Sequence, residues 1–147
     1  MVSFKTIAFS EFTVKELYET LQLRSEVFVV EQDCVYQDVD FKDQKALHVL
    51  GYKNDKLVAY TRIFKPGDYF KEASIGRVVV QENERKYGYG HDLIKESIMS
   101  VEKEFNTKTI HISAQTYLEK FYNTHGFIKS GDGYLEDGIP HIKMIID

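Results

Sequence analysis

Two glycines follow a pair of basic residues in the segment Arg85–Gly90, which reads Arg-Lys-Tyr-Gly-Tyr-Gly. An apolar run from Ile75 to Val80 precedes this segment and an amphipathic run from His91 to Phe105 follows it, so we expect a buried strand, a polar loop and a helix. Glycine lets the backbone approach a ligand closely, and the free N–H groups at a helix N-terminus favour an anion. The segment therefore predicts a diphosphate-binding turn, to which Arg85 and Lys86 add positive charge.

Other glycine turns fit this segment less well. A dinucleotide-binding turn would need a third glycine where Leu93 stands and a turn directly after the strand. A Walker loop is excluded because no Gly-Lys-Ser/Thr sequence follows. A plain strand-to-helix turn stays open, and a nicotinamide dinucleotide site survives only if the turn is assigned wrongly.

The elements around the turn can be read from local patterns. Thr13 and Glu16 form a capping box, and Leu17, Leu21 and Phe28 recur at helical spacing, which predicts a first helix up to about Val30. A last short helix carries Leu118, Phe121, Tyr122 and His125 and stops at Gly126. Strands are expected at residues 2–9, 47–53, 57–65, 73–81, 108–114, 127–134 and 139–146, with a long polar loop at 32–46. This order predicts a single α/β (α+β) domain over residues 1–147, with a mixed sheet and helices against it.

Composition narrows the class of protein. The chain has 147 residues, a formal net charge of −4 and one cysteine, Cys34, which excludes an intramolecular disulfide. The negative charge argues against a nucleic-acid partner, and no apolar run is long enough for a signal peptide or a membrane span. We therefore expect a cytoplasmic protein that binds neither nucleic acid nor membrane.

Two motifs together resemble the GNAT family of acyl-CoA N-acyltransferases. The family has Gln/Arg-x-x-Gly-x-Gly/Ala where the loop meets the helix, as in Arg85–Gly90, and an aromatic-Tyr-x-x-x-Gly-Phe helix end, as in Phe121–Phe127. The order of elements is also similar over nearly the whole chain, which implies a mostly antiparallel sheet. Three further segments, residues 23–32, 36–40 and 136–141, are similar to the ElaA-like branch of the family.

The resemblance implies acetyl-CoA as co-substrate, bound between the strand that ends at Val80 and the strand from Lys108 to Ala114. The implied cofactor-binding residues are Val78, Val79, Val80, Arg85, Lys86, Tyr87, Gly88, Tyr89, Gly90, Gln115 and Tyr122. Gln115 stands where many members have an asparagine that contacts the pantetheine arm.

The resemblance also implies that a neutral amine attacks the thioester and that Tyr122 protonates the departing thiolate. The alternative for Tyr122 is a core aromatic on the face that it shares with Leu118 and Phe121. For the general base we favour Glu31, and Glu82, His48 and His141 are further candidates. His48, His111 and His141 show no metal-ligand spacing, and we expect no metal.

The acceptor is expected to be an amine of a small molecule or a protein. The candidate acceptor-binding residues are Glu31, Asp38, His48 and His141, and Asp40, Glu136 and Asp137 are further acidic side chains that could attract a cation. The alternative function is a non-catalytic acyl-CoA-binding or regulatory module of the same fold. Edge strands at both ends of the chain permit a homodimer without requiring one.

Overall fold

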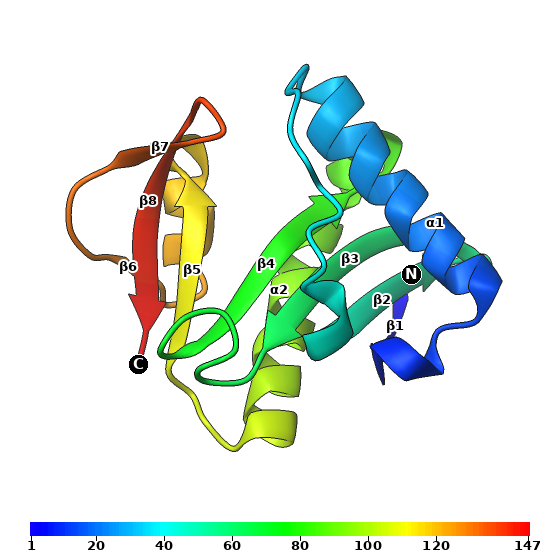
Figure 1. Ribbon diagram of the computed structural model, residues 1–147, viewed down its shortest axis with the longest axis horizontal. Helices are drawn as coiled ribbons and strands as arrows, with labels where there is room; N and C mark the ends of the chain where they lie inside the picture. Colours follow the sequence, from blue (N-terminus) through cyan, green and yellow to red (C-terminus); the bar gives the residue numbers. More distant parts are fainter.

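The computed structural model describes all of residues 1–147. It contains eight strands and three α-helices, which are joined by shorter helical turns (Figure 1). The strands are β1 (Ser3–Ala8), β2 (Leu47–Lys53), β3 (Lys56–Phe64), β4 (Ala73–Val80), β5 (Ile110–Gln115), β6 (Ile128–Lys129), β7 (Tyr134–Glu136) and β8 (Ile139–Ile146). The helices are α1 (Val14–Arg24), α2 (Tyr89–Phe105) and α3 (Glu119–Asn123), with a π-helix η2 (Ser25–Glu31) and a 3-10 helix η4 (Glu82–Tyr87).

All eight strands belong to one sheet of order β1-β2-β3-β4-β5-β8-β6, with β7 paired to β8. Every neighbouring pair is antiparallel except β4 and β5, which are parallel. The expected mixed, mostly antiparallel sheet with flanking helices is confirmed. No helix is long and apolar enough to cross a membrane.

Helices cover both faces of the sheet, with α1 in front of the strands and α2 behind them in Figure 1. Alternate residues of the central strands supply two cores: Val79 packs with Leu23 and Val27 on the α1 side, while Val80 packs with Leu93 on the α2 side. Because β4 is buried on both faces, its continuous valine run is what a two-sided core requires.

The first helix begins as predicted. The Thr13 hydroxyl accepts from the Glu16 N–H, and the Glu16 carboxylate accepts from the Thr13 N–H. The helix continues to Glu31, but its last part is the π-helix η2. Leu17 and Leu21 are only half-buried, and Leu23 and Val27 of the same helical segment pack against the sheet.

The last part of the chain departs from the prediction. Residues 127–134 were expected to form one strand, but they form the two-residue β6 and the start of β7, both of which pair with β8. The intervening Ser130–Gly133 segment contains two glycines, and Gly131 has a φ of 86°. A left-handed residue interrupts the extended backbone, so the chain turns here instead of continuing as a strand. Between β7 and β8 the chain turns at Asp137 and Gly138, both of which have a positive φ.

A bulge in β4 positions the functional site. Tyr60 pairs with Val79 and Arg62 pairs with Gly76, so β4 has an extra residue in this interval, and Arg77 has a φ of 51°. Bulges bend a strand and increase its twist. On its other side, β4 pairs with β5 only through Ala73 and Ser74, after which the two strands diverge (Figure 1).

Candidate active site

Two hollows lie where β4 and β5 separate. The larger, which we refer to as the groove, has a volume of about 590 Å3 and runs from α3 to the N-terminus of α2. The smaller, the inner cavity, has a volume of about 120 Å3 and lies between the loop after η2 and the β7–β8 hairpin. The two share Phe28, Gln32, Val78, Gln115, Leu118 and Tyr122. They therefore meet at one point, beside the unpaired edge of β4.

Most residues expected to bind the cofactor line the groove. These are Val78, Val79, Val80, Arg85, Lys86, Gly88, Gly90, Gln115 and Tyr122. The side chains of Tyr87 and Tyr89 do not line it: Tyr89 is buried in the core, and both rings lie near the Lys53 ammonium. Tyr87 and Tyr89 could therefore contact a ligand in the groove only through their backbone N–H groups.

The two glycines of the turn differ in whether the backbone conformation requires glycine. Gly88 ends η4 and precedes α2 with a φ of 75°, a backbone conformation that residues other than glycine rarely adopt. Gly90 has no such requirement, and a Cβ there would meet only the Phe121 ring at 3.5 Å, which is ordinary contact. Since the protein alone does not need glycine at position 90, the absence of a side chain leaves space for something in the groove.

Arg85 and Glu31, which were expected to serve phosphate binding and base catalysis respectively, contact each other. Two nitrogens of the Arg85 guanidinium lie 2.6 and 2.8 Å from the Glu31 oxygens, and Arg85 Nε donates to the Val80 carbonyl at 3.0 Å. Glu31 lines the groove but not the inner cavity. Its hydrogen bonds raise the pKa of Arg85, so this guanidinium stays charged at the groove mouth.

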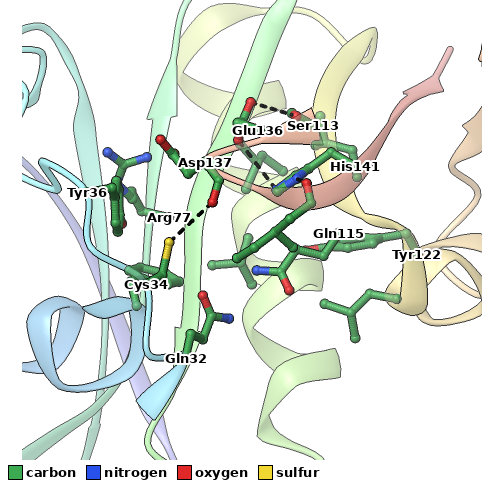
Figure 2. Close-up of a pocket in the computed structure, with 17 residues that line it drawn as sticks. Gln32, Cys34, Tyr36, Arg77, Ser113, Gln115, Tyr122, Glu136, Asp137 and His141 are labelled. Carbon is green, nitrogen blue, oxygen red and sulfur yellow. Dashed lines mark hydrogen bonds and ion pairs between the residues drawn. The ribbon is translucent and has the colours of Figure 1, made fainter. Parts of the chain in front are cut away.

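Tyr122 projects from α3 to the junction of the two hollows (Figure 2). The side chain is almost fully buried, and its edge-to-face contacts with Phe121 and Phe127 fix the ring. Burial raises the pKa of the Tyr122 phenol above its ordinary value, and the nearby Tyr117 adds to this effect. A phenol of this kind remains protonated at neutral pH and can donate a proton.

The inner cavity brings together side chains from five separate segments of the chain. Figure 2 shows Gln32, Cys34 and Tyr36 on one side and Ser113, Gln115, Glu136 and His141 on the other. Cys34 Sγ lies 3.5 Å from the Asp137 carbonyl oxygen and so joins the loop to the hairpin. Of the expected acceptor residues, His141, Glu136 and Asp137 lie here.

Asp38 and Asp40 do not lie free to attract an amine. Asp38 is buried and accepts from Arg24 Nε at 2.9 Å and from the Tyr36 hydroxyl at 2.7 Å, and its Oδ1 is 2.8 Å from Arg77 Nε. Asp40 pairs with Arg62 at 2.7 Å. Burial alone would raise the pKa of Asp40, but the hydrogen bonds and charge of Arg62 outweigh it and hold the pKa below its usual range.

With Asp43, which contacts both Arg24 and Arg62, these residues form a buried arginine–aspartate network of Arg24, Arg62, Arg77, Asp38, Asp40 and Asp43. The network fastens the loop at 32–46 to α1 and the sheet. This corrects the expectation that Asp38 and Asp40 bind the acceptor, because their oxygens already have arginine partners.

His48 is also placed away from both hollows. Its Nε2 donates to the Asp43 carbonyl at 2.9 Å, so its Nδ1 accepts from the Tyr60 hydroxyl at 2.6 Å. Burial lowers the pKa of His48 to about 4, so the ring is neutral at pH 7. His48 was expected to contact the acceptor. Its ring instead contacts the arginine–aspartate network, through the Asp43 carbonyl.

Two other polar candidates lie outside both hollows. Glu82 is exposed and lines neither hollow. His111 stacks on Phe70 and contacts Glu72, outside both hollows. The sequence reasoning missed Arg24, Arg77 and Ser113. An arginine inside the buried face of a helix, followed by three closely spaced aspartates, is the signal that could have revealed the network.

The family model of the acetyltransferase (GNAT) domain matches residues 10–147. Protein ElaA of Escherichia coli is 43% identical over 146 residues, which cover 98% of this chain and 95% of that protein. Its crystal structure superimposes with a TM-score of 0.93 and full coverage of both chains.

Two further solved structures share the fold. An acyl-CoA N-acyltransferase from Pseudomonas aeruginosa is 37% identical, with a TM-score of 0.94 and full coverage of both chains. A GNAT family acetyltransferase from Elizabethkingia anophelis, solved with acetyl-CoA bound, is 14% identical with a TM-score of 0.66, and the match covers 99% of this chain and 97% of that one. The last likeness is one of fold alone.

Proposed function

The chain belongs to the GNAT acetyltransferase family, and from this premise we propose that it transfers the acetyl group of acetyl-CoA to an amine by direct attack on the thioester. The observation that carries the proposal is the meeting of the groove and the inner cavity at Val78, Gln115 and Tyr122. A long ligand in the groove would bring its reactive end to this point. The amine would approach from the inner cavity.

The pantetheine arm would lie along the unpaired edge of β4. Beyond Ser74 this edge has lost β5 as its partner, so backbone N–H and C=O groups around Val78 are available to an extended ligand. Peptides add to sheet edges in the same manner. The Val80 carbonyl already accepts from Arg85, so the proposal relies on Val78 more than on Val80.

The pyrophosphate would lie at the N-terminus of α2. Backbone N–H groups of the first turn lie at the positive end of the helix dipole, and of these the His91 N–H already donates to the Gly88 carbonyl at 3.1 Å. Arg85 and Lys86 line the groove beside them, and Gly90 leaves the space open. Fixed backbone donors with two cationic side chains are suited to a doubly charged diphosphate.

The chemistry would divide between the backbone and one side chain. As the amine nitrogen attacks, the carbonyl oxygen gains negative charge, which a backbone N–H of β4 at the bulge could stabilise. The C–S bond then breaks, and the Tyr122 hydroxyl would donate its proton to the CoA thiolate. Burial keeps this phenol protonated until the thiolate forms.

A thermal-shift titration with acetyl-CoA, CoA and NADH tests the proposal. A ligand at 100 times its Kd stabilises the folded protein by about 2.7 kcal/mol, or roughly 5–10 °C for a chain of this length. We expect such shifts with both CoA species and none with NADH. No shift with either CoA species would contradict the proposal. Acetyl-CoA binding without thiol release from any amine would favour the non-catalytic acyl-CoA-binding module.

Substitution of Gly90 locates the cofactor. Gly90→Glu should fold normally, because an acidic residue in the first turn of a helix is favourable, yet it should show no measurable acetyl-CoA affinity. Gly90→Ala is the matched control, because its Cβ makes only ordinary contact with Phe121 in the free protein. Acetyl-CoA affinity is measured by isothermal titration. Unchanged affinity in a folded Gly90→Glu variant would show that the diphosphate does not bind at this turn.

A further inference from the structure

One wall of the inner cavity carries a connected row of polar side chains. Ser113 Oγ donates to Glu136 Oε1 at 3.2 Å and also contacts the Tyr134 hydroxyl. The other Glu136 oxygen, Oε2, lies 3.4 Å from His141 Nε2. Figure 2 shows Ser113, Glu136 and His141 together at the end of the β7–β8 hairpin. The row ends on an imidazole that lines the cavity.

Backbone geometry fixes which nitrogen of His141 carries the proton. His141 Nδ1 lies 2.7 Å from the Ile139 carbonyl oxygen, which can only accept, so Nδ1 must donate. In the neutral ring Nε2 therefore holds the free lone pair. The ring is held between the cross-strand neighbours Gln115 and Tyr134 and is mostly buried. A base whose second nitrogen is held by an acceptor is oriented in the way that general bases require.

We propose that His141 Nε2 is the general base that receives the proton of the acceptor amine, and that Glu136 is a positioning residue that stabilises the resulting imidazolium. The inference rests on the proposed acetyl transfer and extends it to the acceptor side. It replaces Glu31, which lies in the groove and is paired with Arg85.

The other titratable groups that line the inner cavity are already engaged or are assigned elsewhere. Arg77 and Tyr36 contact Asp38, and Cys34 contacts the Asp137 carbonyl. Asp137 lies at the exposed hairpin turn, and Tyr122 is the proposed acid. His141 Nε2, whose nearest charged neighbour is Glu136 Oε2 at 3.4 Å, is the basic nitrogen that remains among the residues of the cavity.

The cavity also indicates the class of acceptor. Around the polar row the walls are aliphatic, with Ile75, Ile112, Ile139 and Leu118. A volume of about 120 Å3 admits a slender group. An ammonium group beside Glu136 with its carbon stem between isoleucines satisfies both parts of the wall. We therefore assign the acceptor to the class of primary amines on a short aliphatic stem, free or on a side chain.

The step balances as follows. The ammonium gives one proton to His141 Nε2, and this proton passes to solvent. The freed nitrogen lone pair forms the N–C bond, the C–S bond breaks, and the Tyr122 proton goes to the thiolate. The new amide nitrogen loses its second proton, which restores the Tyr122 phenol through water. The products are the N-acetyl amine, CoA thiol and one proton.

Two probe amines separate base catalysis from site shape. Ethylamine is protonated at neutral pH and needs a base, whereas methoxyamine is largely unprotonated and does not. We expect His141→Gln to lower kcat/KM by about 100-fold with ethylamine and to leave methoxyamine nearly unchanged. His111→Gln, outside both hollows, is the control. Equal losses with both amines, or no loss with ethylamine, would overturn the assignment.

Glu136→Gln should lower kcat/KM with ethylamine and leave methoxyamine nearly unchanged, because the carboxylate is needed only when His141 receives a proton. A purely structural role would lower the rate with both amines, which would exclude Glu136 as a positioning residue.

Two further results are decisive without this comparison. Nitrogen NMR of the wild-type protein should show His141 protonated at Nδ1 and bare at Nε2, and the opposite tautomer would overturn the proposal. Wild-type protein that binds acetyl-CoA but accelerates neither amine would refute the aliphatic-amine assignment alone. Failure to bind acetyl-CoA would instead refute the proposed function.

Discussion

The groove and the inner cavity are adjacent but are built in different ways. The groove takes most of its expected binding groups from two short runs, residues 78–80 and 85–90, with Gln115 and Tyr122 added from β5 and α3, and it relies on backbone N–H groups and on missing side chains. The inner cavity takes its polar side chains from the loop after η2, from β4, from β5 and from the β7–β8 hairpin. Binding through the backbone is thus encoded locally, whereas the acceptor side depends on long-range packing.

This difference extends to what holds each hollow in shape. The groove is framed by β4, by the N-terminus of α2 and by α3, which are regular elements with their own backbone hydrogen bonds. One wall of the inner cavity is a loop with little regular structure, held by the buried arginine–aspartate network. Substitutions in that network should therefore affect the inner cavity more than the groove.

Asp38→Ala is the substitution with the largest expected effect, which is on the free energy of unfolding. Removal of one partner from a buried ion pair leaves charged groups uncompensated and costs about 3–5 kcal/mol. We expect this loss in the free energy of unfolding, measured by urea denaturation, with acetyl-CoA affinity of the folded fraction unchanged. The exposed Asp132→Ala is the control and should stay within about 0.5 kcal/mol of wild type. A matching loss of acetyl-CoA affinity would show that the network supports the groove as well.

Tyr122→Phe is next and tests the junction itself. The hydroxyl is proposed to act only when the thiolate leaves, so kcat should fall by about 100-fold while the acetyl-CoA Kd changes by less than about twofold. Tyr117→Phe is the matched control, because this phenol lines the groove but not the inner cavity. Stopped-flow thiol release and isothermal titration give the two quantities. An unimpaired Tyr122→Phe would return this residue to a packing role.

The same contrast explains how far the sequence could predict the molecule. The capping box at Thr13, the β2–β3 turn at Asn54 and Asp55, and the start of a helix beside the two glycines are set by neighbouring residues, and the structure contains all three. The burial of Arg24 was not predictable from its helix alone, because it depends on Asp38 and Asp43 in a distant loop.

His141 illustrates the same limit within the site. The sequence offers it as one of several candidate bases, with nothing to rank it above Glu31 or His48. Its place is decided by the Ile139 carbonyl and by Glu136, which only the hairpin brings together. His48 is excluded as a base by its buried contact with the Asp43 carbonyl, which no local sequence pattern predicts.

Glu31→Gln has the smallest expected effect and separates the two hollows most directly. In the free protein Arg85 is paired with Glu31, so a pyrophosphate must compete with this carboxylate for the guanidinium. An exposed ion pair is worth about 0–1 kcal/mol, so its removal should strengthen acetyl-CoA binding by at most about fivefold. The gain should shrink at high ionic strength, because the interaction is exposed and screened. Isothermal titration at low and high salt measures both.

Glu26→Gln is the control for this change, because it removes the same charge from the same helical segment but does not contact Arg85. A similar gain in both variants would mean that the general field of the helix, and not the Arg85 pair, opposes the cofactor. The value of kcat distinguishes the roles further. Because Glu31 lies in the groove, Glu31→Gln should leave kcat unchanged. A loss of kcat of about 100-fold would instead identify Glu31 as the base and show that the amine is deprotonated on the groove side of the junction.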